Sequence, residues 1–465
     1  MASPASQFNA DATRLVADLE HRQLIRQALA GYEKTRGTQA IRYQSWESAR
    51  DRAAAVKAEA IRNLDRYLVQ FEQNLVARGA KVFWANDGVE ARNYVLGLAR
   101  TRQAKTIVKS KTMVSEEIHL NEALEKAGFK VVESDLGEFI VQLRHEPPYH
   151  IVFPAMHLTR GQISDLFHEK LGAEPTSDPE QLTMTARRTL RQDYCRADIG
   201  ITGANFAVAE TGMISITENE GNARLTLGLP KTHVVLLGIE KIVPKLADLS
   251  LFLPMLATAG TGQQMTGYNS LVGGPRGPGE IDGPEEMHVV LLDNGRTRLL
   301  ADPEQRDALR CIRCGACLNV CPIFRNVGGH TYGTTYQGPI GSVITPHLRG
   351  LQSWQHLSQA SSLCGACTET CPVKIDLHHH LLQNRRNAVA AKRSVSQRLA
   401  FRAFAFVVNR SALFRMTSGI LKALQPLQRI FNSTPADPAW PWTKSREVPV
   451  FARSSFRDLW RQRNS

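Results

Sequence analysis

The chain carries the run CIRCGACLNVCP at residues 311–322 and a second cysteine run, CGACTETCP, at residues 364–372. The first run has the C-x2-C-x2-C-x3-C-P spacing of bacterial two-cluster ferredoxins. In that pattern three thiolates hold one cubane, while the fourth cysteine, which precedes a proline, ligates the other cluster. The two runs therefore predict an electron-transfer module with two [4Fe-4S] clusters.

The crossed pattern assigns each cysteine of the two runs to a cluster. It gives cluster one Cys311, Cys314, Cys317 and Cys371, and cluster two Cys321, Cys364 and Cys367. The second run lacks its first cysteine, because Ser361 stands at that position. Four outcomes are open for the fourth iron of cluster two: ligation by Ser361, by another oxygen or nitrogen ligand or by a partner, or absence of that iron. Three thiolates leave one iron without a strong soft ligand, so we expect cluster two to be labile and to give a three-iron form.

Zinc binding and disulfide formation are the two alternative uses of the cysteines. Structural zinc sites also use C-x2-C pairs, but they need neither the Cys-Pro endings nor a third close cysteine. Disulfides are less favoured, because no signal peptide is visible and closely spaced cysteines in a cytosolic chain usually bind metal. The remaining cysteine, Cys195, is expected to be a buried thiol.

The basic charge of the chain is confined to its C-terminal part. The 465 residues carry a net charge of +13, and residues 382–465 contain 16 Lys and Arg against 3 Asp and Glu, so the rest is neutral. Apolar and basic residues alternate there at helical spacing, which suits a helix docked on protein or, as the alternative, one lying on anionic lipid. No nucleic-acid motif is present. No long apolar run is present, so no membrane-spanning helix is expected. Peripheral membrane contact of a cytoplasmic chain through this tail is an option.

Hydrophobic periodicity divides the chain into four stretches. Residues 1–78 have the apolar spacing of helices, and residues 79–300 alternate short strands with helices, which predicts a largely parallel sheet. One of these strands is expected at residues 150–154, and a helix at residues 115–127. Residues 301–381 hold the cysteine runs, and residues 382–465 form a basic helical extension. The glycine-rich residues 258–283 contain neither a P-loop nor a dinucleotide-binding fingerprint.

Several stretches resemble one known family. They are LRCIRCGAC at residues 309–317, GGH at 328–330, GPIG at 338–341, LCG at 363–365, TGANFAVAETG at 202–212 and MHVVLLDNGR at 287–296. With these, the chain resembles the iron–sulfur subunit of the bacterial three-component L-lactate utilisation system. The resemblance implies a lactate-utilisation (LUD) domain with a NagB/RpiA/CoA-transferase-like fold, an α-helical ferredoxin-like module and a C-terminal extension with a motif like Ser455-Phe456-Arg457. It also implies two partners, a cysteine-rich subunit and a second LUD-type subunit.

A candidate anion site lies in the LUD region. Lys109 and Lys111 stand at the end of an expected strand and just before a helix. Ligands of open α/β sheets bind beyond the carboxyl ends of the strands, where helix N-termini offer free N–H groups. The two lysines therefore suit a carboxylate such as lactate, with solvated lysines as the alternative. Glu210 is a third candidate, and capping a helix is its alternative role. The family often has aspartate where this chain has Asn205, which puts a carboxylate role there in doubt.

Two functions remain open from the sequence. The first is an electron-transfer subunit of a complex that oxidises L-lactate to pyruvate, acting as an electron carrier and not as the sole catalyst. The second is a LUD-domain ligand-binding enzyme or redox-sensing regulator whose clusters are structural or sensory. The nearly complete cysteine framework favours the relay.

Overall fold

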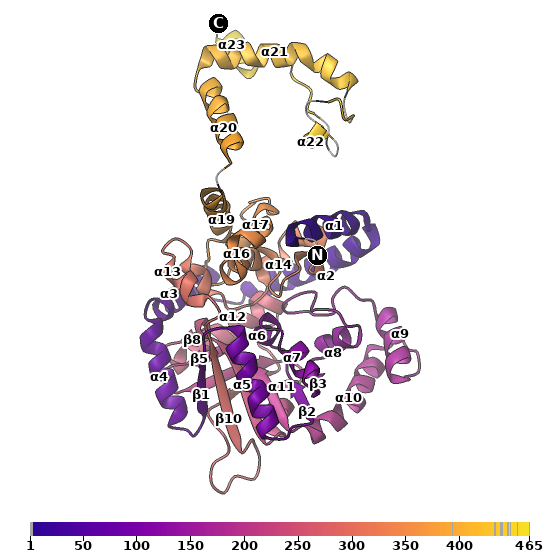
Figure 1. The fold of residues 1–465 in the computed structure, drawn as a ribbon, viewed down its shortest axis with the longest axis vertical. Coiled ribbons are helices and arrows are strands. Elements are labelled where there is room, and N and C mark those ends of the chain that lie inside the picture. Colours follow the sequence, from indigo (N-terminus) through magenta and orange to yellow (C-terminus); the bar gives the residue numbers. More distant parts are fainter. Residues whose placement is uncertain are drawn as a thin grey trace. The chain divides into compact units, whose positions relative to one another are not determined.

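A computed structural model describes residues 3–392, 394–431, 434–437, 440–443, 446, 448–452 and 454–464 (Figure 1). The chain divides into two compact units, Met1–Ala388 and Val389–Ser465. The first unit contains the strands and the cysteine runs, and the second contains the basic tail. The four-part division expected from the sequence stays a prediction.

A six-stranded parallel sheet forms the centre of the first unit. Its order is β1 (Lys81–Ala85), β10 (Glu286–Leu292), β7 (Thr232–Gly238), β4 (Ile199–Gly203), β2 (Thr106–Lys109) and β3 (Lys130–Glu133). Every neighbouring pair is parallel. The neighbouring inner strands β7 and β10 are buried almost throughout, as expected for a sheet covered on both faces. The parallel α/β architecture predicted from the sequence is confirmed.

Alternate side chains of the inner strand β7 belong to two separate apolar cores, one on each face of the sheet. Val234 and Leu236 of β7 pack with α5 (Gly88–Thr101) and α7 (Leu120–Lys126) on one face. Val235 and Leu237 pack on the other face with α4 (Leu64–Val76). Because successive residues of a strand point to opposite faces, this one apolar run anchors both layers. Helices α8 (Leu136–Leu143), α9 (Arg160–Leu171), α10 (Pro179–Arg196) and α11 (Asn222–Gly228) complete the surroundings of the sheet.

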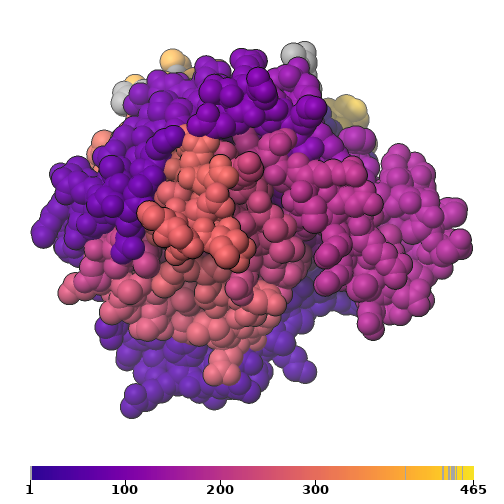
Figure 2. All heavy atoms as spheres, turned by 90° about the horizontal axis from the view of Figure 1, so that it is seen from below, coloured from indigo at the N-terminus to yellow at the C-terminus, as the bar shows by residue number. Residues whose placement is uncertain are grey.

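A smaller mixed sheet lies beside the first. It has the order β8 (Ile242–Val243), β5 (Phe206–Val208), β6 (Met213–Glu218) and β9 (Tyr268–Val272). Residues 273–285 connect β9 to β10 and form the loop below the large sheet in Figure 1. Figure 2 looks onto this side of the molecule, with that loop near the centre and α9 and α10 forming a lobe at one edge. The carboxyl ends of the strands point the opposite way, toward the cysteine module.

The cysteine module consists of short helices above the large sheet in Figure 1. It contains η3 (Arg306–Arg310), α14 (Ala316–Asn319), α15 (Phe324–Val327), η4 (His330–Tyr332), α16 (Gly338–Arg349), α17 (Leu351–Gln359), α18 (Ala366–Thr370) and α19 (Leu377–Ala391). The N-terminal helices α1 (Pro4–Ala17), α2 (Leu19–Ala40) and α3 (Trp46–Arg62) pack on it, and α2 and α3 also pack on α12 (Leu249–Thr261). One continuous apolar core therefore joins the N-terminal helices, the LUD region and the cysteine module.

Two expectations for local structure are wrong. Residues 150–154 form no strand, and their apolar side chains are buried because the segment packs against the cysteine module. His150 holds this segment in a turn: its Nδ1 accepts from the N–H groups of Val152 (3.0 Å) and Phe153 (3.3 Å). The helix expected at residues 115–127 is two helices, α6 (Met113–Glu117) and α7, separated by His119 in the left-handed conformation.

The second unit contains α20 (Val395–Val408), α21 (Ser411–Ile430), α22 (Trp440–Thr443) and α23 (Phe456–Asn464). Many of its apolar side chains are exposed, among them Phe401, Phe404, Leu421 and Ile430. Among the helices that the structure describes, none is long and apolar enough to cross a bilayer.

A buried chain of charges connects the LUD region to the cysteine module. Arg296, at the start of α13 (Arg296–Ala301), donates to both carboxylate oxygens of Glu117 at 2.8 Å and to Glu240 at 2.5 Å. Glu240 also accepts from Arg313 of the first cysteine run at 3.1 Å. The hydroxyl of Tyr336 donates to Glu117 at 2.6 Å. Although burial opposes ionisation, the neighbouring guanidinium groups hold the pKa values of Glu117 and Glu240 below the usual range.

We predict that Arg296→Met destabilises the protein by roughly 3–5 kcal/mol, because it leaves buried Glu117 without its counter-ion and leaves Glu240 with Arg313 alone. The expected result is a large fall in the urea midpoint and in the apparent melting temperature. Arg298→Met, an exposed position on the same helix, is the matched control and should stay within about 0.5 kcal/mol of the parent. Equal urea midpoints for the two variants would show that the buried charge chain does not contribute this free energy of unfolding.

Candidate iron–sulfur and ligand site

The structure gathers the seven cysteines of the two runs in the cysteine module. Cys314, Cys317, Cys321, Cys367 and Cys371 are buried, Cys311 is half-buried and Cys364 is exposed. Cys317 lies in α14 and Cys367 in α18, and the other five lie in the loops that flank η3, α14 and α18. Helix α14 packs against α18. All eight cysteines of the chain are free thiols. The expectation for Cys195 is wrong, because this thiol is exposed on α10, where solvent surrounds a polar helix face.

The thiols fall into two neighbouring groups. Burial raises the pKa of Cys314, and the negative charges of Cys311 and Cys371 raise it further. Burial, Cys311 and Cys314 likewise raise the pKa of Cys317.

In the second group, burial and the charges of Cys321 and Cys364 raise the pKa of Cys367 to about 12. Cys367 also lies near enough to raise the pKa of Cys317, so the two groups adjoin each other. Buried thiols whose charges oppose one another are a donor set that a bound iron cluster would compensate, so these residues fit the predicted cofactor. The grouping supports the crossed assignment, which stays a prediction.

The surrounding backbone shapes the cysteine loops. Backbone N–H groups approach two sulfurs, from Arg313 to Cys311 at 3.4 Å and from Ile375 to Cys371 at 3.3 Å. Such contacts to cluster sulfurs tune the reduction potential. Gly315 adopts a left-handed conformation, and a Cβ there would lie 3.0 Å from His150 and 2.9 Å from Val152. Glycine therefore lets the first cysteine loop pack directly on the turn at residues 149–153.

Ser361 lies half-buried beside the second run. Its Oγ accepts from the N–H of Leu363 at 3.2 Å, and its carbonyl accepts from Arg385 at 2.6 Å. These contacts fix the loop before Cys364. A role of Ser361 as fourth ligand of cluster two stays a prediction.

A cavity of about 390 Å³ lies at the carboxyl ends of the strands, against the first cysteine loop. Its lining includes Lys111 after β2, Lys241 in η1 (Ile239–Lys241) after β7, and Arg313, Cys314 and Tyr336 of the cysteine module. Burial and the charge of Arg313 lower the pKa of Lys241 to about 8. At another part of the lining, burial and the charge of Asp135 raise the pKa of Glu220 to about 7. The cavity therefore brings cationic and acidic groups next to a predicted ligand of cluster one.

The three residues of the predicted anion site are not together. Lys111 lines the cavity, but Lys109 is fully buried and paired with Glu133 at 2.7 Å and with Glu116 at 3.1 Å. Glu210 lies after β5, where its carboxylate accepts from the N–H of Leu246 at 2.8 Å. Lys241 and Arg313 were not predicted as site residues from the sequence. Ligands of open α/β sheets bind beyond the carboxyl ends of the strands, and Lys241 follows the buried strand β7 just as Lys111 follows β2. The same reasoning could therefore have predicted Lys241.

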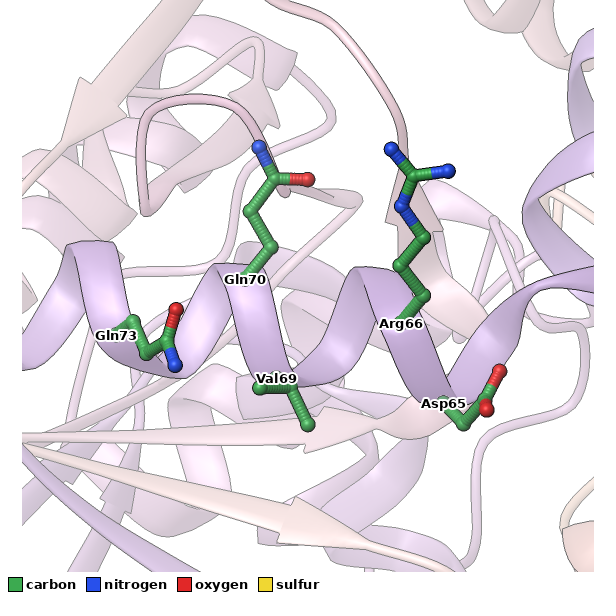
Figure 3. A pocket seen from close by; sticks show the side chains of 5 residues that line it. All are labelled: Asp65, Arg66, Val69, Gln70 and Gln73. Atoms are coloured by element: carbon green, nitrogen blue, oxygen red, sulfur yellow. The ribbon is translucent and has the colours of Figure 1, made fainter.

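Another hollow, of about 470 Å³, runs along the outer face of α4 (Figure 3). Asp65, Arg66, Val69, Gln70 and Gln73 line it, and all five come from this single helix. Figure 3 shows that their polar groups do not converge on one point. We therefore place no site there.

Curated relatives match this chain over nearly its whole length. "Lactate utilization protein B" of Anoxybacillus flavithermus is 44% identical over 96% of both chains. The proteins of that name from Bacillus velezensis and Geobacillus thermodenitrificans are 44% and 46% identical, over 95% and 90% of this chain and 94% and 89% of their own. This chain belongs to the lactate utilization protein B family.

Family models divide the chain in the same order. The LUD domain matches residues 68–292, the 4Fe-4S dicluster domain residues 307–375, and the C-terminal domain of lactate utilisation protein B residues 377–465. The prediction of two [4Fe-4S] clusters is thereby confirmed over the zinc alternative. Among solved structures, a DUF162 family protein from Deinococcus radiodurans overlays 50% of this chain and 98% of its own at 14% identity, and its TM-score of 0.28 is too low to support a conclusion.

We predict that Cys371→Ser damages the cluster held by Cys311, Cys314 and Cys317, because the cysteine before the proline ligates the cluster of the other run. Electron paramagnetic resonance (EPR) of the reduced protein should show the loss of one cluster signal and the retention of the other. Cys195→Ser, at an exposed thiol of α10, should keep both signals. Loss of only the cluster on Cys364 and Cys367 would contradict the crossing.

We predict that cluster two is the first to lose iron in air, because it has three thiolates and one of them, Cys364, is exposed. Mössbauer spectra should show a three-iron form appearing while cluster one stays intact. Ser361→Cys restores the missing thiolate of the run and should slow this loss, whereas Ser362→Cys at the exposed neighbouring position should not. Two intact four-iron clusters in the parent protein after air exposure would contradict the prediction.

Proposed function

We propose that this protein is the iron–sulfur electron-transfer subunit of a system that oxidises L-lactate to pyruvate. The observation that carries the proposal is the pair of adjoining thiol groups, within a chain whose relatives are named for lactate utilisation. Two thiol groups close enough for Cys367 to raise the pKa of Cys317 suit a path for electrons, whereas a single structural site would need only one. This arrangement favours the relay over a regulator with sensory clusters.

The residues of this chain contribute position and charge to the relay. Bound [4Fe-4S] clusters supply one-electron transfer, and lactate oxidation releases two electrons, so two centres in series can pass them on singly. Cys317 and Cys367, one from each group, are both buried, so this part of the proposed path is shielded from solvent. Arg50 donates to the carbonyl of Cys371 at 3.0 and 2.9 Å and places a positive charge beside cluster one.

The finer assignments are also part of this proposal. We propose a cysteine-rich subunit and a second LUD-type subunit as partners, and a NagB/RpiA/CoA-transferase-like fold for the LUD domain. The basic unit at residues 389–465 exposes apolar side chains between its arginines, which suits docking on a partner or on the membrane surface from the cytoplasm. No nucleic-acid partner is proposed.

The experiment is an anaerobic titration of the reconstituted protein with L-lactate, followed by EPR, with and without the two partners. We predict that lactate reduces the clusters only in the complete system, because each cluster accepts a single electron and the glycine-rich residues 258–283 carry no dinucleotide-binding fingerprint. Dithionite reduction of the isolated chain is the control that both clusters are competent. Clusters that stay oxidised in the complete system would contradict the proposal, and reduction by lactate in the isolated chain would favour a self-contained enzyme.

A further inference from the structure

Three cationic side chains from distant parts of the sequence line the cavity beside Cys314. They are Lys111 after β2, Lys241 after β7 and Arg313 between two cysteines of the first run. Lys241 is 8% exposed and makes no hydrogen bond or ion pair among the described residues. Burial and the charge of Arg313 lower the pKa of Lys241, whereas the charges of Glu240 and Cys311 favour its charged form. Because its Nζ makes no direct hydrogen bond and buried ammonium groups are almost always paired, Lys241 can donate to an anion in the cavity.

The other two cations are only partly satisfied. The Nζ of Lys111 is buried without a hydrogen-bond partner, and its closest carboxylate oxygen, on Glu138, is 3.9 Å away. Arg313 gives one nitrogen to Glu240, while its Nη1 is buried without a partner. These free donors belong to the lining of the same cavity.

The acidic groups of the cavity do not neutralise these cations by contact. Asp135 caps α8 through the N–H of Glu138, and Glu218 accepts from the N–H groups of Ala223 and Arg224 at the start of α11. Glu220 accepts from the N–H of Leu136. Their oxygens are thus engaged with helix N-termini, and they stabilise the walls of the cavity.

The balance of charge limits the ligand to a small monoanion. Three cations and three carboxylates line the cavity, and burial together with the charge of Asp135 raises the pKa of Glu220 to about 7. With Glu220 protonated, the lining carries one uncompensated positive charge, which a monoanion would balance and a dianion would exceed. Apolar side chains of Val152, Ile216 and Leu256 form another part of the lining and suit a short aliphatic group. The volume of about 390 Å³ is near the lower end for small-molecule sites.

The cavity is also held tightly against the cysteine loop. A Cβ on Gly260 of α12 would lie 2.9 Å from the carbonyl oxygen of Cys314, so helix and loop are in direct contact. Cys314 itself lines the cavity. A ligand bound here would therefore adjoin a predicted ligand of cluster one.

We propose that this cavity binds a small 2-hydroxy- or 2-oxo-carboxylate, with Lys241 and Arg313 pairing its carboxylate and Lys111 supporting it. The identification of that carboxylate with L-lactate or pyruvate rests on the proposed function. Lys241 is the residue best suited to a test. It lies outside both cysteine runs, and its side chain makes no hydrogen bond or ion pair among the described residues that a substitution would break.

Equilibrium dialysis of the full-length, cluster-loaded protein under anaerobic conditions tests this proposal, with radiolabelled L-lactate and pyruvate as probes and inorganic phosphate as competitor. Saturable binding of at least one carboxylate is expected, with phosphate a weak competitor. Lys241→Met should weaken that binding roughly tenfold or more, since hydrogen bonds to charged groups are strong. Lys241→Arg should restore part of the affinity. Lys231→Met, an exposed lysine at the opposite end of β7, should bind like the parent.

Cluster content and melting temperature of Lys241→Met should match the parent, which separates loss of a ligand contact from loss of folding. Absence of saturable binding, equal affinities of the parent and Lys241→Met, or phosphate binding tighter than either carboxylate would each overturn the proposal. None of these three results would contradict the proposed function, in which lactate reduces the clusters through the partners. If the cavity binds a carboxylate but lactate does not reduce the clusters in the complete system, the proposed electron-transfer function is contradicted. The proposal that the cavity is a carboxylate site is still supported by that result.

Discussion

The buried run of alternating charges from Glu117 through Arg296 and Glu240 to Arg313 is the interaction on which the two modules of the first unit depend. Glu117, Glu240 and Arg296 stand just beyond the carboxyl ends of parallel strands, and Arg313 stands between two cysteines. Each carboxylate is shared between neighbours, so removing one member leaves another buried charge uncompensated. The guanidinium of Arg313 also lies 4.4 Å from the ring centroid of Tyr336, which adds a contact within the cysteine module.

This arrangement has a functional consequence for the sheet. In open α/β folds the carboxyl ends of the strands are where ligands bind, and here that edge is covered by the cysteine module instead of being open to solvent. The space left between them is the cavity that Lys111, Lys241 and Cys314 line. Arg313 takes part in both features, because one of its nitrogens binds Glu240 and its unpartnered Nη1 belongs to a side chain of the cavity lining. The ligand-binding edge and the iron–sulfur module thus share residues.

The sequence predicted the features that local patterns determine. The cysteine spacing predicted the clusters, since a cubane demands thiolates at short fixed intervals, and alternating strands and helices predicted the parallel sheet. Features that depend on contacts between residues far apart in the sequence were not predicted. The run at residues 150–154 looked like a strand because it is apolar, but the cysteine module, not a neighbouring strand, buries it. Lys109 and Lys111 were indistinguishable in sequence, yet Lys109 is enclosed by glutamates and Lys111 lines the cavity. No local sequence pattern could show that Lys241 and Arg313 line the same cavity.

The central claim is that the LUD cavity holds its ligand beside cluster one. Pulsed electron–nuclear double resonance on the singly reduced protein, with a carboxylate labelled with carbon-13, tests that claim most directly. We predict a carbon-13 coupling on the signal of cluster one and none on that of cluster two. A saturating concentration of bound carboxylate without any coupling to cluster one would contradict it.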